Sequence, residues 1–272
     1  MTKIKDAFLD QKAFIAFITA GDPNIKKTEE YILAMVEAGA DLIEIGIPFS
    51  DPIAEGPVIQ EANERALRAG TTTDQIFEMV QHVRIKTSVP LVFMTYVNPI
   101  FTYGAERFFQ NCKTVGINGI ICPDLPFEEK NEFSLFSKKY EIPVISLIAP
   151  TSHKRMEKIA SEAEGFIYCI SSMGVTGIRS DIQTDLHQLV GQIKQYAKIP
   201  VAVGFGISTP KQVREIGQIA DGVIVGSAIV NMVATYGTEA KTHLQKYVQE
   251  MKTETERKKF FRLTKKSGLA ET

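Results

Sequence analysis

Two patterns of apolar and polar positions alternate along the chain. Short runs rich in β-branched residues are typical of buried parallel strands, and longer runs with apolar residues three or four positions apart are typical of amphipathic helices. The predicted strands are residues 14–19, 42–47, 91–96, 119–122, 144–148, 166–171, 201–205 and 222–225. The predicted helices are residues 27–38, 74–86, 106–115, 128–140, 154–163, 185–196 and 210–219, with residues 228–236 and the charged tail as the last one. Eight strands that are each followed by a helix predict an α/β fold with a parallel sheet.

A weak internal repeat favours closure of this sheet into a barrel. Strands three, five and seven begin after an apolar residue and a proline, whereas strands four, six and eight begin with a polar residue and a glycine. This alternation suggests duplication of strand–helix units. An open doubly wound sheet would carry a Gly-x-Gly-x-x-Gly turn after an early strand, and the sequence has none there. We therefore expect a (β/α)₈ TIM barrel, with residues 1–272 forming a single domain.

The composition allows a large core and excludes several classes of partner. Apolar residues make up 44% of the 272 residues, and the net charge is −1. No surplus of positive charge is available to hold a nucleic acid, and no apolar stretch approaches the ~18 residues of a membrane span. The N-terminus lacks the apolar core of a signal peptide, and the three cysteines form no Cys-x-x-Cys pair. We expect a cytoplasmic protein whose cysteines (Cys112, Cys122 and Cys169) are free thiols.

Glu44 is the strongest catalytic candidate. In a barrel of this kind, functional groups lie at the carboxyl ends of the strands and in the loops that follow. Alternation along the second strand directs Ile43, Ile45 and Ile47 toward the helices, so Glu44 should point into the barrel. Desolvation there should raise its pKa toward neutrality, which suits proton transfer. A structural role would need a buried cationic partner, and the other predicted strands contain no lysine or arginine.

Two further acids follow in the proline-rich loop of residues 48–57. Asp51 and Glu55 come within reach of the barrel opening, and two carboxylates can divide acid and base roles when their environments differ. The alternative is that these acids only complement the dipole of the next helix. The four histidines all fall in predicted helices or at helix starts, so we expect neither a histidine base nor a histidine-ligated metal.

Glycine-containing turns indicate a phosphate site at the same end of the barrel. Residues 204–208 and 225–228 follow strands seven and eight, where this fold often binds phosphate, and their glycines expose backbone N–H groups that suit a dianion. Residues 171–181, after strand six, contain two glycines and have the length of a functional lid. Together these features predict a phosphorylated small molecule as the ligand.

The combined motifs resemble the alpha subunit of tryptophan synthase. The likeness runs from residues 17–23 through 44–60, 123–126 and 174–177 to 204–208 and 226–227, so it covers nearly the whole chain. It implies reversible retro-aldol cleavage of indole-3-glycerol phosphate to indole and glyceraldehyde 3-phosphate, in tryptophan biosynthesis and without a cofactor. It also implies a partner, the pyridoxal-phosphate beta subunit, in an αββα heterotetramer.

The resemblance implies that Glu44 and Glu55 are the catalytic residues. Glu44 matches the acid–base residue that protonates C3 of the indole ring and deprotonates the adjacent glycerol hydroxyl. Glu55 matches a carboxylate that stabilises positive charge on the indole nitrogen. The family motif at this point is Ala-Asp-Gly-Pro, whereas this chain has Ala54-Glu55-Gly56-Pro57, and the carboxylate is one methylene, about 1.5 Å, farther from its backbone. A misplacement of ~1 Å can cost about 100-fold in rate.

Substrate-binding roles also follow from the resemblance. The positions that match the surroundings of the indole ring are Phe17, Met94, Tyr96, Ile121 and Tyr168. The positions that match the lid contact and the phosphate site are Thr176, Gly177, Phe205, Gly206, Gly226 and Ser227. Two alternatives remain open: a catalytically weakened barrel that acts mainly as a ligand-binding activator of a beta subunit, and another phosphate-binding barrel enzyme such as an isomerase or a decarboxylase.

Overall fold

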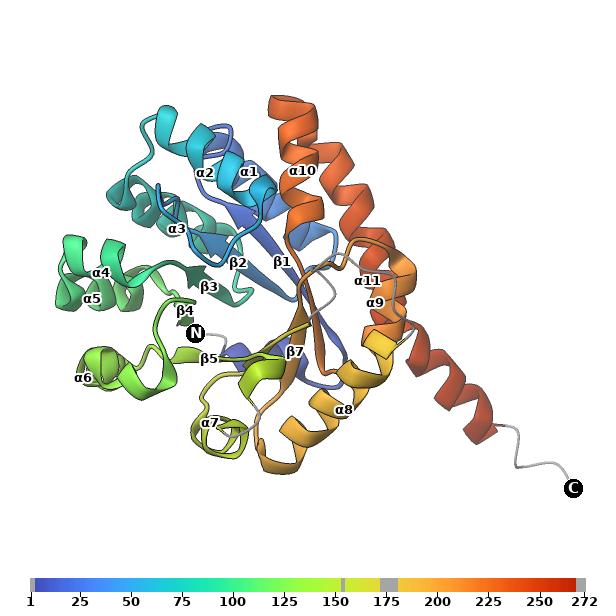
Figure 1. The fold of residues 1–272 in the computed structure, drawn as a ribbon. Helices are drawn as coiled ribbons and strands as arrows, with labels where there is room; N and C mark the ends of the chain where they lie inside the picture. Colours follow the sequence, from blue (N-terminus) through green and yellow to red (C-terminus); the bar gives the residue numbers. More distant parts are fainter. Residues whose placement is uncertain (1–2, 153–154, 172–180, 268–272) are drawn as a thin grey trace, which may run out of the picture.

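Eight parallel strands close into a barrel (Figure 1). The computed structural model describes residues 3–152, 155–171 and 181–267. The strands are β1 (Ala13–Thr19), β2 (Leu42–Gly46), β3 (Leu91–Met94), β4 (Gly119–Ile121), β5 (Val144–Ile148), β6 (Ile167–Ile170), β7 (Val201–Gly204) and β8 (Gly222–Val225). Each strand pairs with the next one in the chain, and β1 pairs with β8. The predicted (β/α)₈ fold is confirmed.

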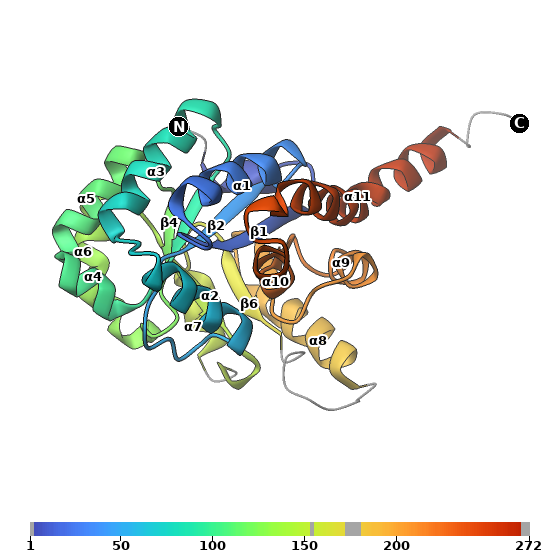
Figure 2. The ribbon, with the colours of Figure 1, turned by 90° about the horizontal axis from the view of Figure 1, so that it is seen from above.

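A layer of helices surrounds the barrel (Figure 2). The α-helices are α1 (Ile25–Glu37), α2 (Pro57–Arg68), α3 (Thr73–Lys86), α4 (Val97–Tyr103), α5 (Ala105–Val115), α6 (Asn131–Tyr140), α7 (Met156–Glu162), α8 (Asp181–Tyr196), α9 (Pro210–Ile216), α10 (Ser227–Tyr236) and α11 (Ala240–Ser267). Short 3₁₀ helices span Ile4–Phe8, Phe127–Glu129, Pro150–Ser152 and Gly237–Glu239. The predicted helix ranges did not include α2, nor α4, a helix of one or two turns that contains Pro99.

The side chains of each strand alternate between two apolar clusters. Ile43 and Ile45 of β2 belong to the cluster that joins the strands to the helices, whereas Leu42 belongs to the cluster inside the barrel. This is the alternation predicted for β2, and it directs Glu44 to the interior. The three cysteines are buried free thiols, as predicted.

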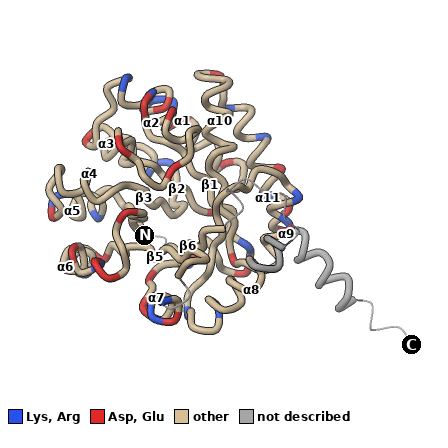
Figure 3. The backbone as a smooth tube through the Cα atoms, in the orientation of Figure 1, with Lys and Arg blue, Asp and Glu red and all other residues tan. Residues whose placement is uncertain are grey.

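The N-terminal 3₁₀ helix closes the barrel at the end where the strands begin. Ile4 and Ala7 are buried in the interior cluster, and the ring of Phe8 lies 5.8 Å from that of Phe166. A functional site inside the barrel must therefore open at the opposite end, where the strands finish. Positive and negative side chains are interspersed along the helices (Figure 3). Within the described ranges, no helix is both long enough and apolar enough to span a membrane.

Candidate active site

Glu44 lies inside the barrel on β2 and is almost completely buried. Its side chain is 1% exposed, and its Oε2 atom accepts no hydrogen bond from the described residues. The neighbouring positions on the paired strands are Phe17 of β1 and Val92 of β3. Burial, with a smaller contribution from the charge of Glu55, raises the pKa of Glu44 to about 8. A carboxyl group in this state holds its proton at neutral pH and can both give and take one.

Glu55 is half-buried in the loop between β2 and α2. The side-chain amide of Asn63 donates a hydrogen bond of 2.7 Å to Oε2 of Glu55, and the side chain of Gln60 donates one of 2.7 Å to its backbone carbonyl. The Tyr96 hydroxyl also hydrogen-bonds the Glu55 carboxylate and accepts a bond of 3.2 Å from the N–H of Ala54. Burial raises the pKa of Glu55, and the bonds from Asn63 and Tyr96 oppose that rise.

Two aromatic side chains lie directly against glycines of the strands. A Cβ atom on Gly46 of β2 would come 2.7 Å from the Phe17 ring, and one on Gly204 of β7 would come 2.5 Å from the Tyr168 hydroxyl. A Cβ at either position would force the ring to move, so each glycine leaves the space that a ring fills. Phe17 also approaches the turn after β8, because a Cβ on Gly226 would lie 3.5 Å from it. One ring therefore lies between the strand of Glu44 and the predicted phosphate turn.

The remaining predicted wall residues are also at the barrel interior. Ile121 and Tyr168 are buried in the interior cluster, and the half-buried Met94 packs against it. Met94 also packs against the small cluster that contains Phe17, which connects the two groups. Tyr96 follows β3, is 1% exposed, and lies 5.3 Å from the ring of Phe49 in the loop after β2. Ile121, Tyr168 and Met94 thus line the barrel interior that contains Glu44, and Tyr96 contacts the loop that contains Glu55.

The turns after β7 and β8 carry the predicted phosphate residues. Phe205 has φ 87° and Gly206 has φ 70°, and Phe205 is 41% exposed. A left-handed phenylalanine is strained, and such strain is concentrated at functional sites. Gly226 is the N-cap of α10, which begins at Ser227. No side chain caps this helix, so the first backbone N–H groups of α10 can donate hydrogen bonds to a ligand. Thr176 and Gly177 lie outside the described residues.

The described histidines are exposed and lie on helices. His82 is exposed and lies 3.5 Å from Glu29, His187 is exposed on α8, and His243 stacks on Tyr236 with 3.6 Å between ring centroids. His153 lies outside the described residues. Among the residues that are described, no group of three or more His, Cys, Asp or Glu side chains is arranged to hold a metal ion. Asp51 is exposed, and the neighbouring hydroxyl of Ser50 donates a hydrogen bond to it.

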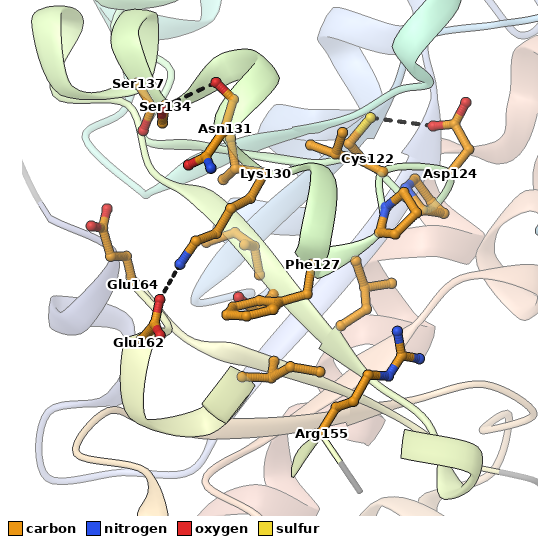
Figure 4. A pocket seen from close by; sticks show the side chains of 18 of the residues that line it. Cys122, Asp124, Phe127, Lys130, Asn131, Ser134, Ser137, Arg155, Glu162 and Glu164 are labelled. Carbon is orange, nitrogen blue, oxygen red and sulfur yellow. Dashed lines mark hydrogen bonds and ion pairs between the residues drawn. The ribbon is translucent and has the colours of Figure 1, made fainter. Parts of the chain in front are cut away.

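A separate cavity of about 740 Å³ lies on the flank of the barrel, between α6 and α7 (Figure 4). Val144 and Ser146 of β5 line its inner wall, and Lys130 and Arg155 line its sides. The Lys130 ammonium is paired with Glu162. None of the predicted site residues lines this cavity, so its size does not identify it as the reaction site.

Sequence reasoning missed Asn63, which is 3% exposed and contacts Glu55. Its signal is a polar residue on the buried face of α2, next to Ala62 and one turn before Ala66. It also missed two buried hydroxyls at strand ends, those of Thr19 and Thr95, whose Oγ1 atoms have no hydrogen-bond partner among the described residues. Unpartnered hydroxyls are not visible in a sequence, because they depend on every neighbour.

Comparisons with known proteins place the sequence in one family. The family model for the tryptophan synthase alpha chain matches residues 5–259. The tryptophan synthase alpha chain of Lacticaseibacillus casei is 46% identical over 259 residues, which are 95% of this chain and 97% of that protein. That of Lactiplantibacillus plantarum is 48% identical over 253 residues, 93% of this chain and 96% of that protein.

Solved structures give the same result. The tryptophan synthase subunit alpha of Legionella pneumophila superposes with a TM-score of 0.85 at 34% identity, covering 94% of this chain and 100% of that one. A chain from the tryptophan synthase α2β2 complex of Pyrococcus furiosus superposes with a TM-score of 0.83 at 38% identity, covering 89% of this chain and 98% of that one. The family predicted from the motifs is confirmed: the chain belongs to the tryptophan synthase alpha chain family.

Proposed function

We propose that this chain cleaves indole-3-glycerol phosphate at the C-terminal end of its barrel, with Glu44 as the residue that transfers the protons. Its family makes it a carbon–carbon lyase of tryptophan biosynthesis. The observation that carries the residue assignment is the buried carboxyl of Glu44, whose Oε2 lacks a partner within the described residues. A buried acceptor of this kind is costly unless a ligand uses it.

The protonation state of Glu44 suits the order of the chemical steps. With a pKa of about 8, Glu44 is mostly protonated at neutral pH and can donate its proton to C3 of the indole ring. The carboxylate that remains takes the proton of the adjacent glycerol hydroxyl. The electrons of that O–H bond form the carbonyl of glyceraldehyde 3-phosphate, and those of the broken C–C bond return to the ring. Indole leaves, and Glu44 is protonated again.

Glu55 has the complementary role. Protonation at C3 places positive charge on the ring nitrogen, and a carboxylate beside it stabilises that charge. The hydrogen bonds from Asn63 and Tyr96 favour the ionised form of Glu55 and hold its longer side chain in one position. The extra methylene is therefore compatible with catalysis.

The substrate's phosphate is assigned to the turns after β7 and β8. The first N–H groups of α10 and the backbone of Phe205 and Gly206 are suited to a dianion, because a helix N-terminus carries partial positive charge. We assign the indole ring to the lining of Phe17, Met94, Tyr96, Ile121 and Tyr168, and the lid contact to Thr176 and Gly177.

The partner is a tryptophan synthase beta subunit. The Pyrococcus furiosus relative comes from an α2β2 complex, and we propose the same αββα assembly for this chain. We also propose that residues 1–272 act as one domain and that the protein works in the cytoplasm.

Incubation of the purified chain with indole-3-glycerol phosphate should release indole. The Glu44→Gln variant should lower kcat by a factor of about 100 to 10,000, the usual contribution of a general acid–base residue. Glu64→Gln, which changes an exposed glutamate on α2, is the matched control and should keep the rate. Full activity of the Glu44 variant would exclude it as the proton carrier. A wild-type chain that releases no indole but accelerates a beta subunit would favour the alternative, a ligand-binding activator.

A further inference from the structure

We infer that Asn63 is a positioning residue that holds the Glu55 carboxylate in place for the reaction, an inference that rests on the catalytic role proposed for Glu55. Asn63 is 3% exposed, and its Nδ2 donates a hydrogen bond of 2.7 Å to Oε2 of Glu55. It is the one polar side chain among the buried residues of α2, whose other buried positions are Ala62 and Ala66. A buried amide is normally kept only where it has a partner, and here the partner is the proposed catalytic carboxylate.

The helix and the loop before it form one rigid support. Pro57 is the first residue of α2, and the helix begins directly after Glu55 and Gly56. The Gln60 side chain, from the first turn, donates a hydrogen bond of 2.7 Å to the Glu55 carbonyl. Two side-chain amides of the same helix therefore fix both the backbone and the carboxylate of Glu55.

This support matters more for a glutamate than for the aspartate of the family motif. The additional methylene adds a rotatable bond, so an unanchored Glu55 carboxylate would sample several rotamers. The bond from Asn63 selects one of them, and the Tyr96 hydroxyl contacts the same carboxylate from the end of β3. Asn63 thereby offsets the misplacement that the longer side chain would otherwise cause.

The same contact affects the charge of Glu55. The titratable groups that face this carboxylate are Glu44 from β2 and Tyr96 after β3, and Asp124 after β4 acts on Tyr96. An N–H donor favours the ionised carboxylate, whereas burial disfavours it. Removing the Asn63 donor should therefore raise the pKa of Glu55 and move the acidic limb of the rate profile to higher pH.

The test is a double-mutant cycle in the full chain, with indole release as the assay. Asn63→Leu should lower kcat/KM by about 10- to 100-fold, as expected for a misplaced catalytic group. It should also shift the acidic limb upward. In a Glu55→Gln background the same change should have an effect of about twofold or less, because Asn63 then has no carboxylate to position.

Two further variants separate positioning from folding. Asn63→Asp keeps the shape but replaces the donor with a carboxyl group, whose like charge should raise the pKa of Glu55 further and shift the acidic limb more than Asn63→Leu does. Asn111→Leu is the matched control, since Asn111 donates a bond of 2.8 Å to Tyr103 in the helical layer, and it should leave the profile unchanged. Equal effects of Asn63→Leu in both backgrounds, or an unmoved pH profile, would overturn the inference. A fully active Glu55→Gln variant would instead refute the proposed role of Glu55 itself.

Discussion

Asp41 and Glu44 are three positions apart, and their environments are opposite: Asp41 directly precedes β2, whereas Glu44 is the middle residue of that strand. At the N-terminal end of the barrel, Oδ1 of Asp41 accepts hydrogen bonds from Gln11 at 2.8 Å and Lys252 at 3.0 Å. Its Oδ2 accepts bonds from the N–H of Phe14 at 2.6 Å and from Lys252 at 2.7 Å. Inside the barrel, Glu44 is more deeply buried and its Oε2 accepts no bond from the described residues.

Burial raises the pKa of both acids, but only Asp41 has a cation that opposes the rise. The Lys252 ammonium and the N–H of Phe14 stabilise the charge of Asp41. The pKa of Glu44 is raised by burial and further by the negative charge of Glu55. The partners of Asp41 offset part of the cost of burying its charge, whereas Glu44 has no such partners and is available to a substrate. The two ends of the barrel thus separate stability from function, as is usual in this fold.

The largest expected effect is a pH-dependent gain of stability on removing the Glu44 charge. Its pKa is 4.5 when unperturbed and about 8 in the folded chain. Between these values the folded chain binds a proton that the unfolded chain has released, so stability falls as the pH rises. Glu44→Gln removes this dependence. Its free energy of unfolding, relative to wild type, should rise by about 1.4 kcal/mol per pH unit between roughly pH 5 and 8.

Urea unfolding at several pH values measures this slope. Any difference in packing between the new amide and the carboxyl group changes the free energy of unfolding by the same amount at every pH and leaves the slope unaffected. The exposed Glu64→Gln variant is the control and should run parallel to wild type. Parallel curves for Glu44→Gln as well would mean that Glu44 is ionised in the folded chain, and the contrast with Asp41 would then be lost.

The next largest effect on stability is expected for the ion pair of Lys252 and Asp41, at the N-terminal end of the barrel. The side chain of Lys252 on α11 is 9% exposed and that of Asp41 is 10% exposed. Lys252→Met should lower the free energy of unfolding by about 3 kcal/mol, because it leaves a buried carboxylate without its cation. Indole release per folded molecule should remain unchanged, because the pair lies at the N-terminal end of the barrel and the proposed substrate site is at the C-terminal end.

Adding Asp41→Asn to that variant provides the control. The double variant should recover part of the loss, since no unpaired charge remains. Two results would show that stability and function do not belong to separate ends of the barrel. One is a loss of stability below about 1 kcal/mol in the single variant, and the other is a reduced rate of indole release when that variant is fully folded.

These contrasting environments were only partly predictable from the sequence. The inward direction of Glu44 follows from strict alternation with three isoleucines, and the barrel follows from eight short buried runs, because both are local patterns. The pairing of Asp41 with Lys252 joins residues 211 positions apart and depends on how α11 packs. Local patterns carry no information of this kind.

In the candidate site, too, some features could be predicted from the sequence and others could not. Glu55 was predicted from its motif, but its partner Asn63 lies eight residues later on α2, and the conformation of the loop that contains Glu55 decides whether the two meet. The left-handed conformation of Phe205 was also unpredicted, because a phenylalanine gives no local signal for it. Strand-end positions can thus be located from sequence, whereas the hydrogen bonds that tune them require the tertiary structure.

The smallest expected effect concerns the second acid at the N-terminal end, Asp221, which precedes β8. Burial by itself would raise its pKa, but bonds from Lys194 at 2.7 Å and from the N–H of Val201 at 3.0 Å, together with the charge of Lys12, lower it. Lys194 is about one-third exposed, so Lys194→Met should cost less than about 1 kcal/mol in urea unfolding near neutral pH. Since a depressed pKa stabilises the fold above the unfolded value of 3.8, that small contribution should disappear in acid. If Lys194→Met lost as much stability as Lys252→Met, solvent exposure would not explain how much each ion pair contributes to stability. Each carboxylate at the N-terminal end of the barrel would then depend on one cation.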